Sequence, residues 1–252
     1  SGAHVFVTNT LFMGNMLIHE SFNKSTGQGN GSGIYIDSGA SLTVVDCRFN
    51  GNGHPSVTPS TNHSGNPRAG AFYGGAIYST VPTHISYSRF CGNRVIHSYY
   101  NNTYSGGGTV FLAGAASGST VKNCLFAANQ DTQNWSGTSL PVTKQGGALV
   151  VSLDSAAGTV EIENSTFAYN LCDGKYCAAG LTVTAGSVNV KNCVFGGNMI
   201  GANASDKSVD INVRSGASCY VSYTLLSQDG ALRSTDVATA CQAGGTLELG
   251  EG

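Results

Sequence analysis

Apolar and polar residues alternate along seven short stretches of the chain, and each stretch ends in the same phrase. The clearest copy, residues 190–198, reads Val-Lys-Asn-Cys-Val-Phe-Gly-Gly-Asn. Counting back from its phenylalanine, the fifth preceding position is apolar in every copy and the fourth is mostly polar. Because side chains alternate between the two faces of a β-strand, this pattern predicts a strand with one buried face. The Asn, Asp or Tyr at the third preceding position indicates a turn, and the residue after it is always small.

A second kind of strand precedes each alternating one. It is a short apolar run after glycines or other small residues, as in residues 31–36, 74–79, 106–113, 146–153, 178–185 and 208–213. The phrase phenylalanines, with Leu226 closing the series, are separated by 37, 41, 36, 41, 28 and 31 residues. A fixed phrase with variable spacing predicts coils of constant cross-section that carry loops of variable length. We therefore expect an all-β fold, a right-handed, single-stranded parallel β-helix of about seven coils.

Stacking such coils places equivalent residues above one another, about 4.8 Å apart. One column is then an aromatic stack inside the solenoid, formed by Phe12, Phe49, Phe90, Phe126, Phe167 and Phe195. A second column is an amide ladder, formed by Asn15, Asn52, Asn93, Asn129, Asn170 and Asn198. Asparagine suits this place because its amide both donates and accepts hydrogen bonds.

The same register bears on the cysteines. Cys47, Cys124 and Cys193 share one inward column, but a serine separates each from the next. They are therefore two coils, roughly 9–10 Å, apart, beyond the roughly 7 Å limit for a disulfide. We expect three buried thiols.

The remaining cysteines leave room for disulfides. Cys172 and Cys177 lie in one short loop and are expected to bond in an oxidising compartment. Cys219 and Cys241 are a second candidate pair. Because no Cys-x-x-Cys pair occurs, we expect no zinc site.

The composition of the chain excludes some classes of binding partner. Charged residues make up only 10% of the chain, and the net charge is −2 with no basic stripe, so we expect no nucleic-acid partner. No apolar run reaches the roughly 18 residues that a membrane span needs, so membrane insertion is not expected. No signal peptide is visible at the start.

Both chain ends interrupt a coil. Residues 1–9 match the second half of a repeat, and residues 244–252 resemble the first half of another. We expect one domain over residues 1–252, either a segment of a longer solenoid or a subunit that stacks head to tail into a filament.

Long insertions follow the phrase asparagine in the early coils, at residues 16–30, 53–73, 94–105 and 130–145. Because all leave from the same corner, these loops should cluster on one edge. Candidate binding residues there are Tyr99, Tyr100, Tyr104, Trp135, His97 and Arg68. Aromatic loops with little charge suit a glycan or protein ligand, and the alternative is that they pack on one another over the core.

A catalytic constellation is not visible. Glu161 and Glu163 lie on the outward face of one strand, about 7 Å apart, and are expected to be solvated strand residues. Four aspartates are expected to be turn formers or to occupy the asparagine column: Asp131, Asp173, Asp206 and Asp229. We expect no catalytic residue, cofactor or metal ligand.

Seven Asn-x-Ser/Thr sequons occur. Six fall in predicted loops and are candidate glycosylation sites: Asn23, Asn30, Asn62, Asn101, Asn134 and Asn203. The seventh, Asn164, lies in the core phrase and is expected to be blocked.

Two motifs carry a family resemblance. Gly-Gly-Ala-Ile at 74–77 with Phe-Cys-Gly-Asn at 90–93, and Gly-Gly-Ala-Leu at 146–149 with Phe-Ala-Tyr-Asn at 167–170, resemble the GGA-[ILV] and F-x-x-N repeats of chlamydial polymorphic outer-membrane proteins. The resemblance implies a surface-exposed β-helical passenger used in adhesion. We therefore expect a non-catalytic module outside the cell or at its surface. The alternatives are a carbohydrate-active β-helix enzyme, a lyase or glycoside hydrolase, and a filament subunit.

Overall fold

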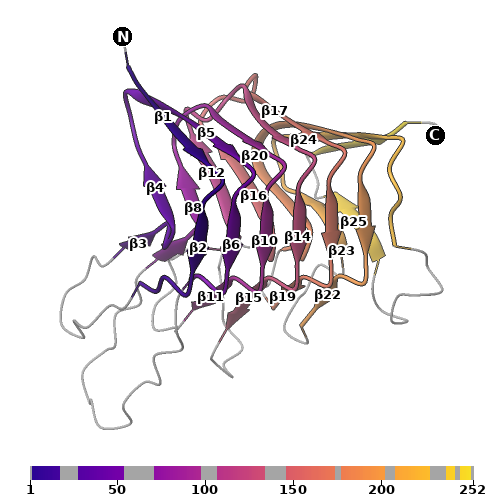
Figure 1. The fold of residues 1–252 in the computed structure, drawn as a ribbon. Helices are drawn as coiled ribbons and strands as arrows, with labels where there is room; N and C mark the ends of the chain where they lie inside the picture. The colour runs from indigo at the N-terminus through magenta and orange to yellow at the C-terminus, as the bar shows by residue number, and fades with distance from the viewer. Residues whose placement is uncertain are drawn as a thin grey trace, which may run out of the picture.

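The computed structural model describes residues 2–17, 28–53, 71–97, 107–133, 146–173, 177–201, 208–227, 237–241 and 245–250. Over these residues the chain forms 26 strands and no helix. The strand pairs in the described part are all parallel, and each strand pairs with its equivalent in the next repeat. Figure 1 shows the strands following one another along a single direction, with the two termini at opposite ends. The all-β, parallel, stacked part of the predicted fold is confirmed.

Two rows of strands correspond to the two halves of the repeat. The leading sheet contains β4 (Ile34–Ile36), β8 (Ile77–Ser79), β12 (Val110–Gly114), β16 (Leu149–Leu153), the start of β20 (Leu181–Lys191), β23 (Ser208–Val213) and β25 (Val237–Cys241). The alternating sheet contains β1 (Ala3–Thr8), β5 (Ala40–Val45), β9 (Thr83–Ser86), β13 (Ser119–Lys122), β17 (Thr159–Glu163), the end of β20, β24 (Ala217–Ser222) and β26 (Thr246–Leu249). Because β20 runs through both rows, they join into one 14-stranded sheet.

Shorter strands complete each repeat. The phenylalanine sheet contains β2 (Leu11–Met13), β6 (Arg48–Asn50), β10 (Arg89–Cys91), β14 (Leu125–Ala127), β18 (Thr166–Ala168) and β21 (Val194–Gly196). The corner sheet contains β11 (Arg94–His97), β15 (Gln130–Gln133), β19 (Leu171–Cys172) and β22 (Met199–Ile200). A separate pair joins β3 (Gln28–Asn30) to β7 (Ala71–Tyr73).

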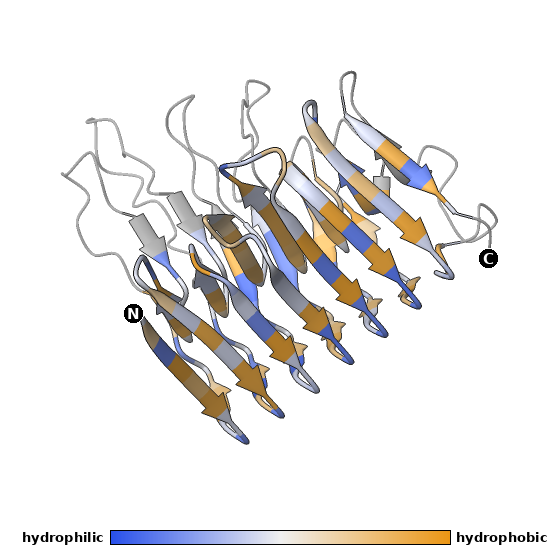
Figure 2. Cartoon of the chain, turned by 90° about the horizontal axis from the view of Figure 1, so that it is seen from above, coloured by the Kyte–Doolittle hydropathy of each residue, from blue (hydrophilic) through white to orange (hydrophobic). Residues whose placement is uncertain are grey.

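The alternating sheet has the one-sided burial that its sequence predicts. Leu42 and Val44 of β5 are fully buried, whereas Thr43 and Val45 between and after them are partly exposed. Figure 2 shows the corresponding alternation of orange and blue along several of these strands. The leading sheet differs, because all five residues of β16 are buried and the strand therefore has two covered faces.

The turn predicted before each phrase phenylalanine is confirmed by the backbone. The residue three positions before it has a φ between 46° and 55° in all seven copies: Asn9, Asp46, Tyr87, Asn123, Asn164, Asn192 and Tyr223. Asparagine and aspartate tolerate this left-handed conformation better than other non-glycine residues. The turn redirects the chain from the alternating sheet into the phenylalanine sheet, with the small residue that follows facing inward.

The phenylalanine column is a continuous stack. Successive rings from Phe12 to Phe195 have centroids 4.5–4.8 Å apart and planes within 7° of parallel. The rings of Phe49, Phe90, Phe126 and Phe167 are fully buried. This confirms the predicted register, because a slip of one residue in any coil would remove its ring from the column.

The asparagine ladder is also confirmed, and its geometry repeats from coil to coil. In each rung the backbone N–H and the Nδ2 of one asparagine both donate to the Oδ1 of the next, at 2.9–3.1 Å. For Asn93, Nδ2 also donates to the carbonyl oxygen of Phe49 in the preceding coil, at 2.8 Å. The same holds for the other buried members of the ladder, Asn52, Asn129, Asn170 and Asn198. Each of these five amides therefore ties three successive repeats together, and its side-chain polar atoms are satisfied although it is buried.

The cysteine expectations are confirmed where the side chains are described. Cys47, Cys124 and Cys193 are buried free thiols. Burial raises the pKa of both the Cys124 and the Cys193 thiol to about 11, so neither is a ready nucleophile at neutral pH. The second candidate disulfide cannot be followed, because the side chain of Cys241 lies outside the described residues.

Several predicted boundaries are wrong. Residues 28–30, 71–73, 94–97 and 130–133, which we placed in loops, are strands. The last two belong to the corner sheet, and Val95 and Asp131 from them are buried. Strands this short show too few alternating positions to be recognised by periodicity. Residues 246–249, which we assigned to a leading strand, pair with β24 in the alternating sheet instead. The two glycines before residue 246 match the sequence pattern that precedes the leading strands. In the structure, however, Leu247 aligns with Cys219 and Leu249 with Val221 of β24.

Replacing Asn93 by alanine should lower the free energy of unfolding by roughly 3–5 kcal/mol. The change leaves two donors of Asn52 and the carbonyl oxygen of Phe49 buried without their partner. Urea denaturation followed by far-UV circular dichroism measures the loss. The control is Asn50→Ala on β6, a half-buried position outside the ladder, where a change below about 1 kcal/mol is expected. Equal losses for the two variants would show that the ladder adds nothing specific.

Candidate functional site

The loop edge is the site that the sequence predicts, and most of its candidate residues lie outside the described part of the chain. Arg68, Tyr99, Tyr100, Tyr104 and Trp135 lie outside the described residues. His97 is the last residue of β11, and only its backbone is described. What the structure shows is the row from which the loops leave, since β11, β15, β19 and β22 are adjacent in the corner sheet. These predicted binding residues therefore remain predictions.

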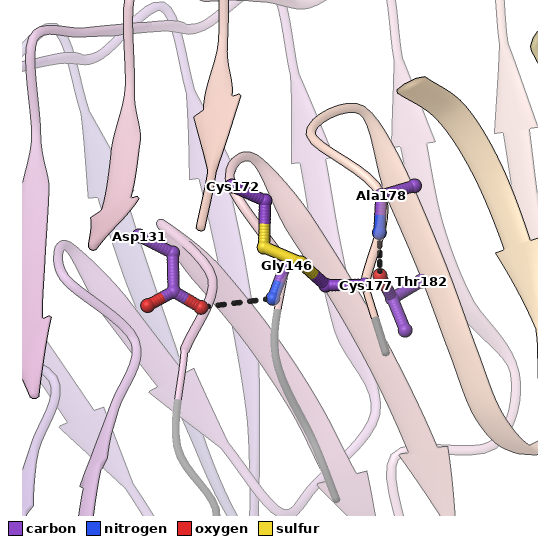
Figure 3. Close-up of a disulfide and its surroundings, with 6 residues drawn as sticks. All are labelled: Asp131, Gly146, Cys172, Cys177, Ala178 and Thr182. Atoms are coloured by element: carbon purple, nitrogen blue, oxygen red, sulfur yellow. Dashed lines mark hydrogen bonds between the residues drawn. A yellow bond between two sulfur atoms is a disulfide. The ribbon is translucent and has the colours of Figure 1, made fainter. Parts of the chain in front are cut away.

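Three contacts lie where loops meet the strands of the corner and leading sheets (Figure 3). The carboxylate Oδ2 of Asp131 on β15 accepts a hydrogen bond from the backbone N–H of Gly146, at 3.0 Å. Cys172 and Cys177 form the expected disulfide. The backbone N–H of Ala178 donates to the hydroxyl of Thr182, at 3.0 Å. Asp131 is thus a buried acceptor within a strand, and its assignment as a turn former is wrong. Asp173 follows β19, and Asp206 and Asp229 lie outside the described residues.

The glycosylation candidates are mostly untested. Asn23, Asn62, Asn101, Asn134 and Asn203 lie outside the described residues. Asn30 is the last residue of β3, in a strand and not a loop, and its side-chain oxygen is buried. Asn164, which we expected to be blocked, is exposed at its turn. The turn that precedes the phenylalanine projects its side chain outward, which explains the error.

A shallow groove of about 290 Å³ lies along the outer face of the alternating sheet near its C-terminal strands. Glu161, Asn189, Tyr220 and Glu248 form one row across four strands, because they are Cα partners in register. Asn189 Nδ2 donates to Glu161 Oε1 at 2.7 Å. In the next row Glu163 pairs with Lys122 at 3.1 Å. Both glutamates therefore point outward, as expected, and each has a partner on a neighbouring strand.

A row of aromatic residues lies on the outer face of the leading sheet. Tyr35, Tyr78 and Phe111 are Cα partners on β4, β8 and β12. The Tyr35 and Tyr78 rings are stacked with centroids 5.6 Å apart, and those of Tyr78 and Phe111 are 5.7 Å apart. Burial is the largest cause that raises the pKa of Tyr78 above its usual value. Sequence reasoning missed this row because both tyrosines were counted within apolar runs, without regard to which face they occupy.

In the described part of the chain, the asparagine ladder ends on a residue that sequence reasoning also missed. Asn198 Nδ2 donates to Asp210 Oδ1 at 3.0 Å, so an aspartate on β23 closes the column. Ser227 donates to the same carboxylate twice, from its backbone N–H to Oδ2 at 2.7 Å and from its hydroxyl to Oδ1 at 3.1 Å. Asp210 is fully buried, and desolvation raises its pKa above 3.8 despite these three donors.

The described residues hold no group of three or more His, Cys, Asp or Glu side chains that could bind a metal ion. The same residues include no helix that is long and apolar enough to cross a membrane. A scan against protein-family models, a search of curated proteins and a search of solved structures each found no significant match.

Asp210 should make the protein less stable as the pH rises. Its folded-state pKa lies above the value of about 3.8 in the unfolded chain, so the folded state binds this proton more tightly. The stabilisation is complete below pH 3.8 and is lost as the pH rises through the folded-state pKa. Urea denaturation of the wild type and of Asp210→Asn between pH 3 and pH 7 tests this. The free energy of unfolding of Asp210→Asn relative to the wild type should increase with pH, and a constant difference would contradict the assignment.

Proposed function

We propose that the chain is a right-handed, single-stranded parallel β-helix that acts as a non-catalytic binding module for a glycan or protein ligand. Parallel pairing of each repeat with the next, in register, supports a continuous coil. The handedness follows the general rule that crossovers between parallel strands of one sheet are right-handed. Closed coils of this kind would fix every outward residue relative to the residues of the next coil.

The observation that carries the binding role is the aromatic row of the leading sheet. Tyr35 is 52% exposed, although it stacks on a neighbouring ring and hydrogen-bonds to Asp37. Exposed aromatic surface held in one orientation is typical of ligand-binding faces, because little side-chain entropy is lost on binding. The groove beside Tyr220 adds a second polar and aromatic surface on the adjoining sheet.

We further propose that the module works outside the cell or at its surface. The Cys172–Cys177 disulfide supports this location, because structural disulfides persist in oxidising compartments. The exposed sequon at Asn164 and the candidate sequons in the loops fit the same environment. The filament alternative has weaker support. Head-to-tail stacking would continue the ladder only if the last rung offered donors, and Ser227 already directs its donors to Asp210.

The second candidate function is a carbohydrate-active enzyme, and the groove is what favours it. Glu161 and Glu163 line this groove with Glu248, and paired carboxylates are the usual groups for glycoside hydrolysis. The hydrogen bond from Asn189 and the ion pair with Lys122 support a different role for the two glutamates. Both are partly exposed residues with polar partners on neighbouring strands, and neither lies in the kind of apolar pocket that holds a general acid.

Glycan-array binding combined with a reducing-end assay on the bound glycans tests the proposal. We expect the purified chain to bind glycans and to release no product over a day. The double variant Glu161→Gln/Glu163→Gln should bind the same glycans, since both residues have structural partners. Product release by the wild type that disappears in the double variant would establish the enzyme instead. If the chain binds neither glycans nor extracellular-matrix proteins, the binding role is wrong.

A further inference from the structure

Positive charge is concentrated in one part of the chain. Residues 47–130 contain no aspartate or glutamate, although 14 acidic residues occur in the whole sequence. The same stretch contains five of the 12 basic residues, which are Arg48, Arg68, Arg89, Arg94 and Lys122. Because most of these residues are far apart in the chain, they form no basic stripe in the sequence. The register of the strands shows which of them are neighbours.

Arg48 and Arg89 are neighbours on the outer face of the phenylalanine sheet. They are Cα partners on β6 and β10, which lie side by side (Figure 1). Phe49 and Phe90, the next residue of each strand, are fully buried, so both arginines point outward, and both are exposed. Neither makes an ion pair or a side-chain hydrogen bond with another described residue. We call Arg48 and Arg89 the arginine pair.

The arginine pair is an unfavourable arrangement within the sheet. Like charges directly opposite one another on neighbouring strands destabilise the pairing. Other basic residues of the same stretch have partners. Lys122 pairs with Glu163 at 3.1 Å. Arg94 donates to Gln130 Oε1 from Nε at 3.2 Å and from Nη2 at 3.0 Å. The arginine pair therefore costs stability that no described neighbour offsets, and both guanidinium groups are available to a ligand.

Tyr87 lies at the edge of the phenylalanine sheet, two residues before Arg89. It occupies the left-handed turn, with a φ of 52°, and is 64% exposed. Asparagine or aspartate occupies this turn in five of the seven copies, and both adopt the conformation at lower cost than a residue with a large side chain. An aromatic ring is thus held at a strained position close to an unpaired positive charge. Strained backbone positions cluster at binding sites, so the coincidence indicates a site for a ligand.

Asp46 adds an acceptor to the same surface. It occupies the equivalent turn before Arg48, is exposed, and makes no ion pair with that arginine. Its carboxylate oxygens are therefore free to accept hydrogen bonds from a ligand. The surface over β6 and β10 combines two guanidinium groups, one carboxylate and one aromatic ring. That set suits a ligand in which an anionic group, hydroxyl donors and a C–H surface occur together.

We propose that the arginine pair binds a sulfate or carboxylate group of an acidic glycan, whose sugar ring packs against Tyr87 and whose hydroxyl groups donate to Asp46. This inference rests on the proposed binding function and names its ligand class and the face that binds it. A guanidinium presents its N–H donors in a planar fork that matches two oxygens of a carboxylate or of a tetrahedral oxyanion. The C–H groups of a pyranose carry small positive charges and pack on the negative face of an aromatic ring.

The mixed charge of this surface favours an acidic glycan over a nucleic acid or an acidic peptide. A nucleic acid carries a phosphate on every nucleotide, and its affinity grows with the number of phosphates that Lys and Arg neutralise. Here two arginines lie near one carboxylate, so a densely charged strand gains little. An acidic peptide would bind the arginines, but it has few hydroxyl groups for Asp46 and no need of the ring of Tyr87.

Isothermal titration calorimetry of the whole chain with three hexasaccharides tests this site. Chondroitin 4-sulfate carries carboxylates and sulfates, hyaluronan carries carboxylates alone, and the chitin hexasaccharide is neutral. At least one acidic hexasaccharide should bind the wild type about tenfold more tightly than the neutral one. If hyaluronan binds at least as tightly as chondroitin 4-sulfate, the bound group is a carboxylate, and otherwise it is a sulfate.

Three variants test the residues of the site. Arg48→Gln and Arg89→Gln should each weaken the binding of the acidic hexasaccharide about fivefold, because each removes a charged donor. Neither should lower the melting temperature, since each removes a like-charge contact. Tyr87→Asn should also weaken binding about fivefold, and it should raise the melting temperature because asparagine suits the turn.

Two further variants are matched controls. Arg94→Gln removes an exposed arginine from the corner sheet. Tyr223→Asn removes a 62% exposed tyrosine from the same kind of turn, where Leu225 stands in place of an arginine. Both variants should bind the acidic hexasaccharide within about twofold of the wild type.

The outcomes separate this inference from the proposed function. If neither variant of the arginine pair weakens binding, or if Arg94→Gln weakens it as much, the pair is not the site, while the binding role stands. The same holds if the chain binds only neutral glycans or proteins. If poly-glutamate or single-stranded DNA binds more tightly than the acidic hexasaccharides, and Tyr87→Asn leaves that affinity unchanged, charge alone is recognised and the glycan is wrong. If no hexasaccharide, arrayed glycan or matrix protein binds, this site and the proposed function fail together.

Discussion

The amide ladder sets the constraint that the rest of this fold follows. Each rung receives two hydrogen bonds at one oxygen and sends donors both to the next coil and to a carbonyl of the preceding one. Because the rungs are buried, a rung that is out of line leaves several polar atoms without partners, each at a cost of about 1–3 kcal/mol. The ladder therefore holds each repeat in register directly over the one before it. The parallel phenylalanine rings three residues earlier in each copy are a consequence of the same alignment.

Alignment of the inward columns also aligns the outward residues. In a globular fold, two exposed side chains from distant parts of the sequence meet only when loops and packing bring them together. Here Tyr35 and Tyr78, 43 residues apart, become neighbours because their strands occupy the same place in successive repeats. The row from Glu161 to Glu248 arises in the same way on the adjoining sheet. The inward positions are restricted to particular residue types, while the outward positions are free to carry the chemistry that decides function.

That division explains which features could be predicted from the sequence. The phenylalanine and asparagine columns and the turn at residues such as Asn123 and Asn164 depend on inward or backbone requirements, which repeat in every coil and are therefore visible. The Cys172–Cys177 disulfide is visible because the two residues are close in the chain. By contrast, Asp210 closes the ladder from a strand of the leading sheet, 12 residues beyond Asn198, where no phrase marks it. The Tyr35–Tyr78 pair and the corner strands were missed for a related reason, since each needs a register that short strands do not reveal by themselves.

The hydrogen bonding that extends the ladder can also end it, because each further rung needs both donors and acceptors. An asparagine rung can be continued indefinitely because it offers both donors and acceptors to its neighbours. A carboxylate only accepts, so Asp210 can receive the amide of Asn198 but cannot donate to a further rung. Ser227 completes this closure by turning its backbone and hydroxyl donors back onto the carboxylate. Burial removes the Asp210 carboxylate from water, which disfavours its charged form and therefore raises its pKa. Over the described residues, the amide column thus ends in a pattern that offers no donors for another rung, although the alternating sheet continues for one more strand, β26.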